Sequence, residues 1–129
     1  MDRRVINPWT WQERAGFVQA HEIGPGARTL YCAGVASVDA DGQPIRAGDM
    51  AGQLGQALDN LETLLHAAGY SLTDLVRLNT YTTDIDAYGV ARAVVADRLA
   101  DARYTATLLG VTRLARPELL VELEATAAA

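Results

Sequence analysis

Two glutamates near the C-terminus, Glu122 and Glu124, are the clearest candidates for acid–base chemistry in this chain. They lie in the stretch LLVELEA at residues 119–125, where charged and apolar side chains alternate. Alternation places the two carboxylates on one face of a β-strand and the apolar side chains on the other. A carboxylate on such a face is either solvated or held in a pocket, where it can take a proton from water. From the residues alone, the two interpretations carry equal weight.

Other residue types that carry chemistry form weaker patterns. His21 and His66 lie far apart and lack the spacing of metal ligands, so we expect no metal site. Cys32 lies among apolar residues in LYCAG, which favours a packed thiol over a nucleophile. The sequence contains no glycine-rich phosphate loop and no G-x-S-x-G motif, and we expect no cofactor. The glutamates therefore remain the principal candidates.

The charge of the chain narrows the classes of partner. The formal net charge is −5, and the eleven basic residues are arginines scattered along the sequence. An acidic chain without a basic cluster repels a phosphate backbone, so nucleic acid is disfavoured as a partner. No apolar run approaches the ~18 residues that span a bilayer, so we expect no membrane segment. A single cysteine and the lack of an apolar leader favour a reducing, cytoplasmic location.

Two segments have the periodicity of amphipathic helices. Residues 49–68 carry apolar side chains every three or four positions, with Asp49 as a helix-capping residue and Gly69 at the C-terminal end. Residues 86–99 repeat the pattern with alanine, valine and leucine. Both segments are therefore predicted to pack one face against a core.

The remaining apolar segments are predicted strands. Residues 17–38 form a hairpin around the turn GPGA, and further strands occupy residues 75–84, 105–112 and 118–127. The order β-β-α-β-α-β-β predicts a single domain over residues 1–129, an α+β fold with a mixed sheet and both helices on one face. Some strands are apolar on both faces, because adjacent residues point to opposite sides and both are apolar at Leu108–Leu109 and at Leu120–Val121. Self-association would cover the second face, so we expect an oligomer.

Several stretches together resemble the RidA family, also called YjgF/YER057c/UK114 and once described as endoribonuclease L-PSP. AGFVQA at residues 15–20 is similar to the family's G-P-Y-x-Q-A opening, and LYCAGVAS to its I-x-x-S-G-Q strand. The segment QALDNLETLLHAAGYSLTDLVRLNTYTTDIDAY at 56–88 is similar to its helix–strand signature. GVTRL followed by LLVELEA resembles its ending, V-E-I-E-A. The resemblance covers nearly the whole chain.

This resemblance implies a chorismate-mutase-like fold (bacillus type) and a homotrimer whose sheets line a central barrel, with active sites in clefts between subunits. It also implies hydrolysis of reactive imines and enamines such as 2-aminoacrylate to a 2-oxo acid and ammonia. An arginine of the family binds the substrate carboxylate, and a glutamate positions the attacking water. Glu122 falls on that glutamate, which favours the pocket interpretation over the solvated one.

The cleft residues implied by the resemblance depart from the family pattern. Phe17 stands where the family often has tyrosine, Ala33 where it commonly has serine, and Arg92 where many members have asparagine. Ala106 takes the place of the carboxylate-binding arginine. The expected substrate-binding residues are Phe17, Ala33, Arg92, Ala106, Thr107 and Leu108.

The loss of the arginine at Ala106 changes the expected activity. A guanidinium makes two charge-assisted hydrogen bonds to a carboxylate, whereas alanine makes none. Losing ~2–5 kcal/mol of binding would slow the reaction about thirty-fold to several thousand-fold. We therefore expect an enzyme for an imine, enamine or related small molecule that lacks a free carboxylate, and not an efficient 2-iminopropanoate deaminase. A trimer that binds a metabolite or protein without catalysis is the alternative, and an endoribonuclease is third.

Overall fold

The computed structural model describes residues 2–129 and consists of one five-stranded sheet, one two-stranded sheet and several helices. The strands are β1 (Arg3–Ile6), β2 (Ala20–Ile23), β3 (Thr29–Tyr31), β4 (Val35–Ala36), β5 (Leu75–Thr82), β6 (Thr105–Gly110) and β7 (Val121–Ala128). The α-helices are α1 (Met50–Ala67), α2 (Ile85–Ala91) and α3 (Ala93–Arg98), with short 3-10 helices η1 (Trp11–Ala15) and η2 (Leu72–Asp74). No described helix is both long enough and apolar enough to cross a membrane.

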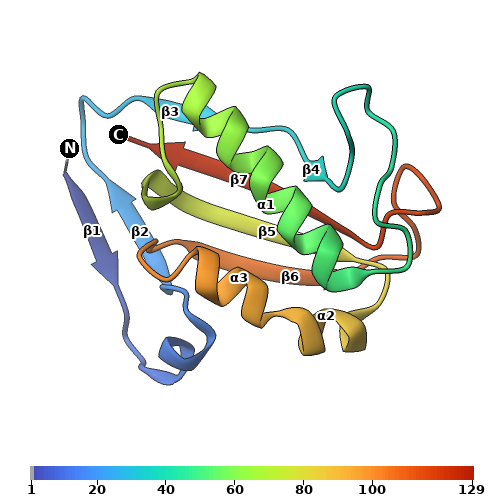
Figure 1. Cartoon of the computed structure of the whole chain (residues 1–129). Coiled ribbons are helices and arrows are strands. Elements are labelled where there is room, and N and C mark those ends of the chain that lie inside the picture. Colours follow the sequence, from blue (N-terminus) through green and yellow to red (C-terminus); the bar gives the residue numbers. More distant parts are fainter. Residues whose placement is uncertain (1) are drawn as a thin grey trace.

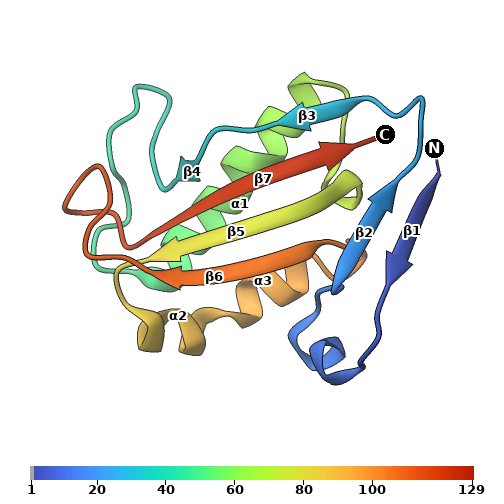
Figure 2. The ribbon, with the colours of Figure 1, turned by 180° about the vertical axis from the view of Figure 1, so that it is seen from behind.

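The large sheet is mixed, in the order β3-β7-β5-β6, with β4 also paired to β7. β5 and β6 run parallel, while β7 is antiparallel to β3, β4 and β5. All three α-helices lie on the same side of this sheet (Figure 1). From behind, the strands stand in front of the helices and no helix covers them (Figure 2). The arrangement confirms the predicted α+β class with the helices on one face; we call the uncovered side the open face.

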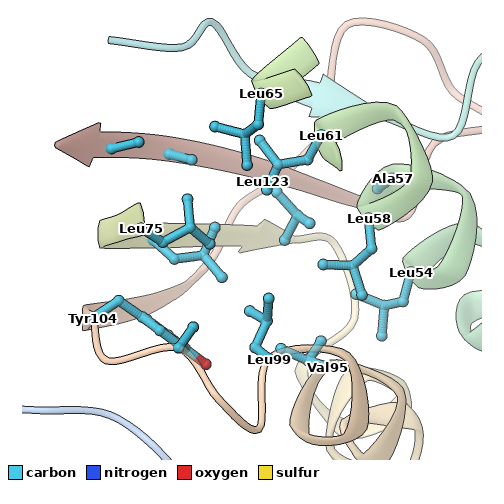
Figure 3. Packing of buried hydrophobic residues seen from close by; sticks show 14 of the residues in the cluster. Leu54, Ala57, Leu58, Leu61, Leu65, Leu75, Val95, Leu99, Tyr104 and Leu123 are labelled. Atoms are coloured by element: carbon cyan, nitrogen blue, oxygen red, sulfur yellow. The ribbon is translucent and has the colours of Figure 1, made fainter. Parts of the chain in front are cut away.

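The core forms between α1 and the sheet. Leu54, Leu58, Leu61 and Leu65 are fully buried on one stripe of α1 and point towards the strands, where Leu123 of β7 meets them (Figure 3). Each such side chain contributes about 1.5–3 kcal/mol through its removal from water. Because alternate residues of β7 are buried against this stripe, the strand has a fixed orientation relative to the helices.

The ends of α1 follow the capping signals in the sequence. The Asp49 carboxylate accepts a hydrogen bond from the backbone N–H of Gly52 at 2.9 Å, and Gly69 beyond the helix has a φ of 83°. Gln53, in the first turn, is fully buried. Its amide donates to the Glu118 carbonyl and accepts from the Leu120 N–H, each within 2.9 Å. This side chain therefore ties the start of α1 to the segment that leads into β7.

The predicted hairpin over residues 17–38 is wrong. β2 pairs with β1, and β3 and β4 pair with β7. The N-terminal strand β1 has no extended apolar alternation in RRVI, so the sequence pattern gave no partner for β2 other than the segment after GPGA. A turn composition predicts a change of direction, but it does not decide which strands pair. That choice is made by the long central strand β7, whose backbone groups hold both β3 and β4.

The predicted helix over residues 86–99 is divided into α2 and α3 at Arg92. The dihedral angles of Arg92 remain helical, at φ −59° and ψ −20°, and its carbonyl accepts from the N–H groups of both Val95 and Ala96. The division is therefore a local tightening of one continuous helical path. It follows closely on Gly89, a residue that weakens a helix by about 1 kcal/mol relative to alanine.

The open face is also more polar than the sequence predicted. Arg77, Asn79 and Glu124 occupy its centre, and exposed apolar side chains lie towards its margins at Tyr31 and Leu109. The expectation of a second apolar face is thus wrong for the centre of the sheet. The β-bulge between Leu75 and Arg77 contributes at one end of β5, where Leu75 is buried in the core instead of sharing the face of Arg77.

Candidate functional site

Glu122 lies on the open face of β7, beside β4 and β5. It pairs with Ala36 on one side and Tyr81 on the other, while its neighbours Val121 and Leu123 are fully buried on the helix side. The side chain is half-buried, and its carboxylate has no hydrogen bond or ion pair within residues 2–129. Removal from water, and secondarily the charge of Glu124, raise the pKa of Glu122 above its ordinary value. A carboxylate in this state is a stronger base than a solvated one.

Gly34 determines how closely the chain passes over that carboxylate. Between β3 and β4, a Cβ at Gly34 would lie 2.5 Å from Oε1 and 2.7 Å from the carboxyl carbon of Glu122. Real Cβ atoms do not approach other atoms so closely, so any larger residue would displace the Glu122 side chain. The backbone of Gly34 therefore forms one wall beside the carboxylate, and Ala33 precedes it as an exposed residue.

Glu124, two residues further along the same face, has different surroundings. The Tyr81 hydroxyl donates a hydrogen bond to its Oε1 at 2.7 Å, and the Asn79 amide donates to the same atom at 3.1 Å. These two donors, Tyr81 first, lower the pKa of Glu124 below its ordinary value. The carboxylate is stabilised as an anion, so it is poorly suited to accept a proton.

A cavity of about 490 Å³ lies on the helix side of the sheet, between β6, the α2–α3 segment and η1. Leu78 of β5 is buried and pairs with Ala106 of β6, so Ala106 and Leu108 project to this side. Phe17 forms part of another wall, and its ring meets Trp11 edge to face with centroids 5.8 Å apart. The size is within the ~300–1,000 Å³ of small-molecule sites.

Three charged residues line the cavity: Glu13, Arg14 and Arg92. Arg92 lies where α2 meets α3 and is exposed, and its guanidinium makes no hydrogen bond or ion pair to any residue from 2 to 129. Glu13 and Arg14 are neighbours in η1, and both side chains are exposed. Among the described residues, neither Arg92 nor Arg14 forms an ion pair, so both are cations available to a ligand of the cavity.

Two tyrosines add hydroxyl groups to the same cavity. Burial raises the pKa of Tyr104 to about 12, and burial also raises the pKa of Tyr88, against a hydrogen bond from Thr80 that lowers it. The Arg92 charge acts on the pKa of both phenols in the opposite direction, and all three residues line the cavity. Both hydroxyls stay protonated at neutral pH and are able to donate hydrogen bonds. In Figure 3 the Tyr104 side chain lies at the edge of the core beside Leu99.

The structure brings most of the predicted substrate-binding residues together, but not all of them. Those that line the cavity are Phe17, Arg92, Ala106, Thr107 and Leu108. Ala33 and Glu122 do not line it, because Glu122 projects from the open face and the cavity opens on the helix side. The catalytic candidate Glu122 and the cavity that most of the binding candidates line therefore lie on opposite sides of one sheet within a single protomer.

Four residues of these two regions were not predicted from the sequence: Gly34, Arg14, Tyr88 and Tyr104. Gly34 stands at the glycine of the I-x-x-S-G-Q resemblance, which was the available signal for its position beside the site. Tyr104 stands where the family pattern P-A-R-[ST] has proline, a difference that marks a changed cavity wall. Arg14 and Tyr88 have no distinguishing local pattern, because only the fold places them beside β6.

Comparisons with known proteins agree on the family. The model of the family Endoribonuclease L-PSP matches residues 11–129. A RutC family protein of Pyrococcus horikoshii is 32% identical over 98 residues, which cover 76% of this chain and 77% of the relative.

Solved structures give the same result for the fold. A member of the conserved Rid protein family from Yersinia pestis is 36% identical, covers 100% of both chains and superposes with a TM-score of 0.86. RidA from a Psychrobacter species is 26% identical, with 88% of this chain and 89% of that chain covered and a TM-score of 0.72. These matches confirm the chorismate-mutase-like fold that the resemblance implied. The chain belongs to the Endoribonuclease L-PSP family, the group that includes YjgF and RidA.

Proposed function

We propose that this protein is an enzyme for small imines or enamines, with Glu122 as the proton-transfer residue. The observation that carries the proposal is the state of the Glu122 carboxylate: half-buried, without a hydrogen-bonding partner in the described chain, and raised in pKa. Structural carboxylates on strands are normally solvated or paired, as Glu124 is. An unpaired acid beside a glycine backbone is instead available to a water molecule and a substrate.

The chemistry follows from this placement. Glu122 accepts a proton from water while the water oxygen bonds to the electrophilic carbon of the C=N group. The C=N π electrons pass to nitrogen, which receives that proton from the Glu122 carboxyl group and gives a carbinolamine. Transfer of a second proton from the hydroxyl to nitrogen, through the same carboxyl group, releases ammonia and leaves a carbonyl. An imine and water thus give a carbonyl compound and ammonia, and the carboxylate is regenerated.

A complete site in this proposal needs two copies of the chain. Glu122 lies on the open face and the cavity opens on the helix side, so one protomer cannot place both around one substrate. We propose that the cavity of one copy meets the open face of the next, in the homotrimer that family membership suggests. The exposed Leu108 and Leu109 at the β6 edge supply apolar area for such a contact.

Ala106 limits the substrates in this proposal. No cation projects from β6 into the cavity, so a substrate whose carboxylate adjoins the reacting carbon has no partner on that strand; the arginines Arg14 and Arg92 belong to other walls. We therefore propose low activity on 2-iminopropanoate.

Imines generated in situ by amine and amino-acid oxidases provide the test. A flavin amine oxidase supplies a neutral imine, a D-amino-acid oxidase acting on D-alanine supplies 2-iminopropanoate, and semicarbazide traps whatever imine survives. The protein is expected to reduce the trapped neutral imine far more than the trapped 2-iminopropanoate. If the protein leaves the amounts of both trapped imines unchanged but a small ligand raises its melting temperature, it is a binding protein and not an enzyme for these imines.

A further inference from the structure

Residues 2–23, which we call the N-terminal arm, form a unit of their own at one end of the large sheet. β1 and β2 pair with each other and with no other described strand, and η1 lies in the segment that connects them. The two strands lie beside the start of β6 (Figure 2). Residues of η1, and Phe17 shortly after it, line the cavity. The arm is therefore one wall of the cavity, and its position affects how open that cavity is.

The Arg3 guanidinium ties the arm to the rest of the chain. Its Nη1 donates to the Thr73 carbonyl at 3.2 Å, and its Nη2 donates to the carbonyls of Leu75 and Arg103 at 3.1 Å and 3.0 Å. These carbonyls belong to η2, to the start of β5 and to the segment before β6. One side chain thus joins β1 to three separate segments, so docking of the arm depends on the position of Arg3.

Other contacts of the arm with the rest of the chain lie near the start of β2. The Val18 N–H donates to the Tyr104 carbonyl at 2.9 Å, and Phe17 packs, partly buried, against the core. These contacts do not involve the far end of the arm, where Arg3 lies. Loss of the Arg3 contacts would therefore loosen the arm without unfolding the core, and exchange of the Val18 amide proton would report that loosening.

His21 in β2 is poorly placed to carry a positive charge. Its Nδ1 is buried and has no hydrogen-bonding partner in residues 2–129. The ring also makes a hydrogen bond with the backbone of Val76, and because Nδ1 is unpartnered, this bond uses Nε2. Protonation would thus give Nδ1 a buried N–H group without an acceptor, which is unfavourable.

The charged groups that act on His21 are two arginines. Burial first, and then the charge of Arg3 in β1, lower the pKa of His21 below its ordinary value of 6.5. The charge of Arg103, before β6, acts in the same direction, while the hydrogen bond with Val76 in β5 acts against it. A proton on His21 would therefore add a third positive charge beside the residue that ties the arm down.

Among the described residues, no carboxylate acts on the pKa of His21. Glu22, the next residue of β2, projects to the other face of the ribbon and pairs with Arg4 at 3.2 Å. Asp74 in η2 accepts a hydrogen bond from the Ser71 N–H at 2.8 Å. The positive charge of a protonated His21 is thus not offset by a nearby anion.

We propose that His21 and Arg3 form a pH-sensitive switch, which keeps the N-terminal arm docked beside the cavity at neutral pH and loosens it in mild acid. Once the arm is released, the His21 ring is solvated and protonates at its ordinary pKa. Because the pKa in the docked arm is lower, docking is strongest above pH 6.5 and weakens as pH falls below that value. The proposal goes beyond the imine chemistry and does not depend on it, since it concerns only the wall of the cavity.

Hydrogen exchange followed by NMR tests the switch in the intact protein. The Val18 amide reports opening of the arm, and the Leu123 amide in β7 reports opening of the core. After correction for the intrinsic exchange rate at each pH, the opening equilibrium at Val18 is expected to rise at least about threefold between about pH 7.5 and about pH 5. No comparable rise is expected at Leu123.

Substitution of each histidine assigns the pH dependence. The sequence has two histidines, so His66→Gln in α1 is a matched control for His21→Gln. The acid-induced opening at Val18 is expected to vanish in His21→Gln, which cannot be protonated, and to persist in His66→Gln. Arg103→Gln should reduce the pH dependence, because it removes one repelling charge and keeps the carbonyl that Arg3 binds. Arg3→Gln should raise the opening at both pH values.

Opening at Val18 that is equal at both pH values in the wild type would overturn the proposal, as would a rise that persists in His21→Gln. A rise that disappears in His66→Gln would also contradict it. Circular dichroism and the Leu123 amide check that each variant folds. If His21→Gln fails to fold, NMR titration of the His21 ring in the wild type and in Arg103→Gln decides: a ring that titrates at 6.5 or above in the wild type would contradict the switch.

Discussion

Glu122 and Glu124 lie two residues apart on the same face of β7, yet their surroundings give them opposite properties. Glu124 accepts hydrogen bonds from Tyr81 and Asn79, and its pKa is lowered. Glu122 has no such partner in the described residues, lies against the Gly34 backbone and has a raised pKa. Identical side chains on one strand thus divide into a stabilised anion and an available base. The difference shows that partners and solvent exclusion, more than residue type, decide which carboxylate is suited to chemistry.

The largest expected effect separates the two carboxylates by activity. Glu122→Gln removes the proton acceptor without changing side-chain shape, so imine turnover should fall about 100-fold or more. Glu124→Gln is the matched control, on the same strand and face, and should change turnover by no more than about threefold, as exposed substitutions usually do. Initial rates of ammonia release measure both. An equal loss of turnover in the two variants would show that Glu122 has no catalytic role that Glu124 lacks.

Mixing of variants tests whether Glu122 serves a neighbouring copy. Glu122→Gln and Ala106→Trp, which fills the cavity, should each be inactive alone. When the two variants are co-expressed in equal amounts and assemble at random, about a quarter of the interfaces between subunits combine an intact carboxylate with an intact cavity. About a quarter of wild-type activity should therefore return.

The control for this experiment places both substitutions in one chain. When that double variant is co-expressed with Glu122→Gln, no chain carries Glu122. No interface between subunits then combines an intact carboxylate with an intact cavity. Activity that fails to return in the first mixture, although gel filtration finds mixed oligomers, would place the whole site within a single protomer.

A smaller effect is expected from the wall beside Glu122. Gly34→Ala puts a methyl group 2.5 Å from Oε1 of Glu122, so the carboxylate must move and turnover should fall about ten-fold. Gly55→Ala in α1 is the control, since a Cβ there meets nothing within 4 Å and alanine stabilises a helix by about 0.5–1 kcal/mol. Melting temperatures show whether Gly34→Ala acts through the site or through folding. A large drop in melting temperature would mean that Gly34 has a structural role.

The pH dependence of turnover should report the raised pKa of Glu122. The base must be ionised, so activity is lost as pH falls through this pKa, at a higher pH than for an ordinary glutamate. Glu124→Gln removes one cause of the increase, the neighbouring negative charge, and should move the acidic limb to lower pH. The profile of kcat/KM against pH measures the shift. A limb that stays in place would mean that desolvation alone raises the pKa.

The smallest expected effect concerns stability at Glu124. Its pKa is lowered in the folded state, so its contribution to stability is present above the ordinary carboxyl pKa and is lost as pH falls through the folded value. Tyr81→Phe removes the first of its donors and should lower the melting temperature slightly at neutral pH, with no difference in strong acid. The group is fully exposed to solvent, which keeps the effect small. A loss that persists in acid would arise from packing instead of this hydrogen bond.

Much of the fold was predictable because it depends on local patterns. The apolar stripe and Asp49 cap predicted α1 to within one residue at each end, and the alternation in LLVELEA predicted which residues of β7 face the core. The hairpin at residues 17–38 was wrong, because strand pairing depends on which distant backbone groups are free. The candidate site shows the same division: the resemblance named Glu122, Arg92 and Ala106, but it did not place Tyr88 and Tyr104 beside Arg92 and Ala106 in one cavity.

The sequence by itself determined the family, the α+β class, the orientation of β7 and the identity of the two carboxylates, because hydrophobic period and capping act within a few residues along the chain. Only the tertiary structure decided that Glu122 has no partner in the described chain while Glu124 has two, and that the cavity opens on the other side of the sheet. Those properties arise from β4, β5 and the α2–α3 segment, which are far from β7 in sequence. Solvent exclusion and hydrogen bonding depend on distance in space, and folding alone sets that distance.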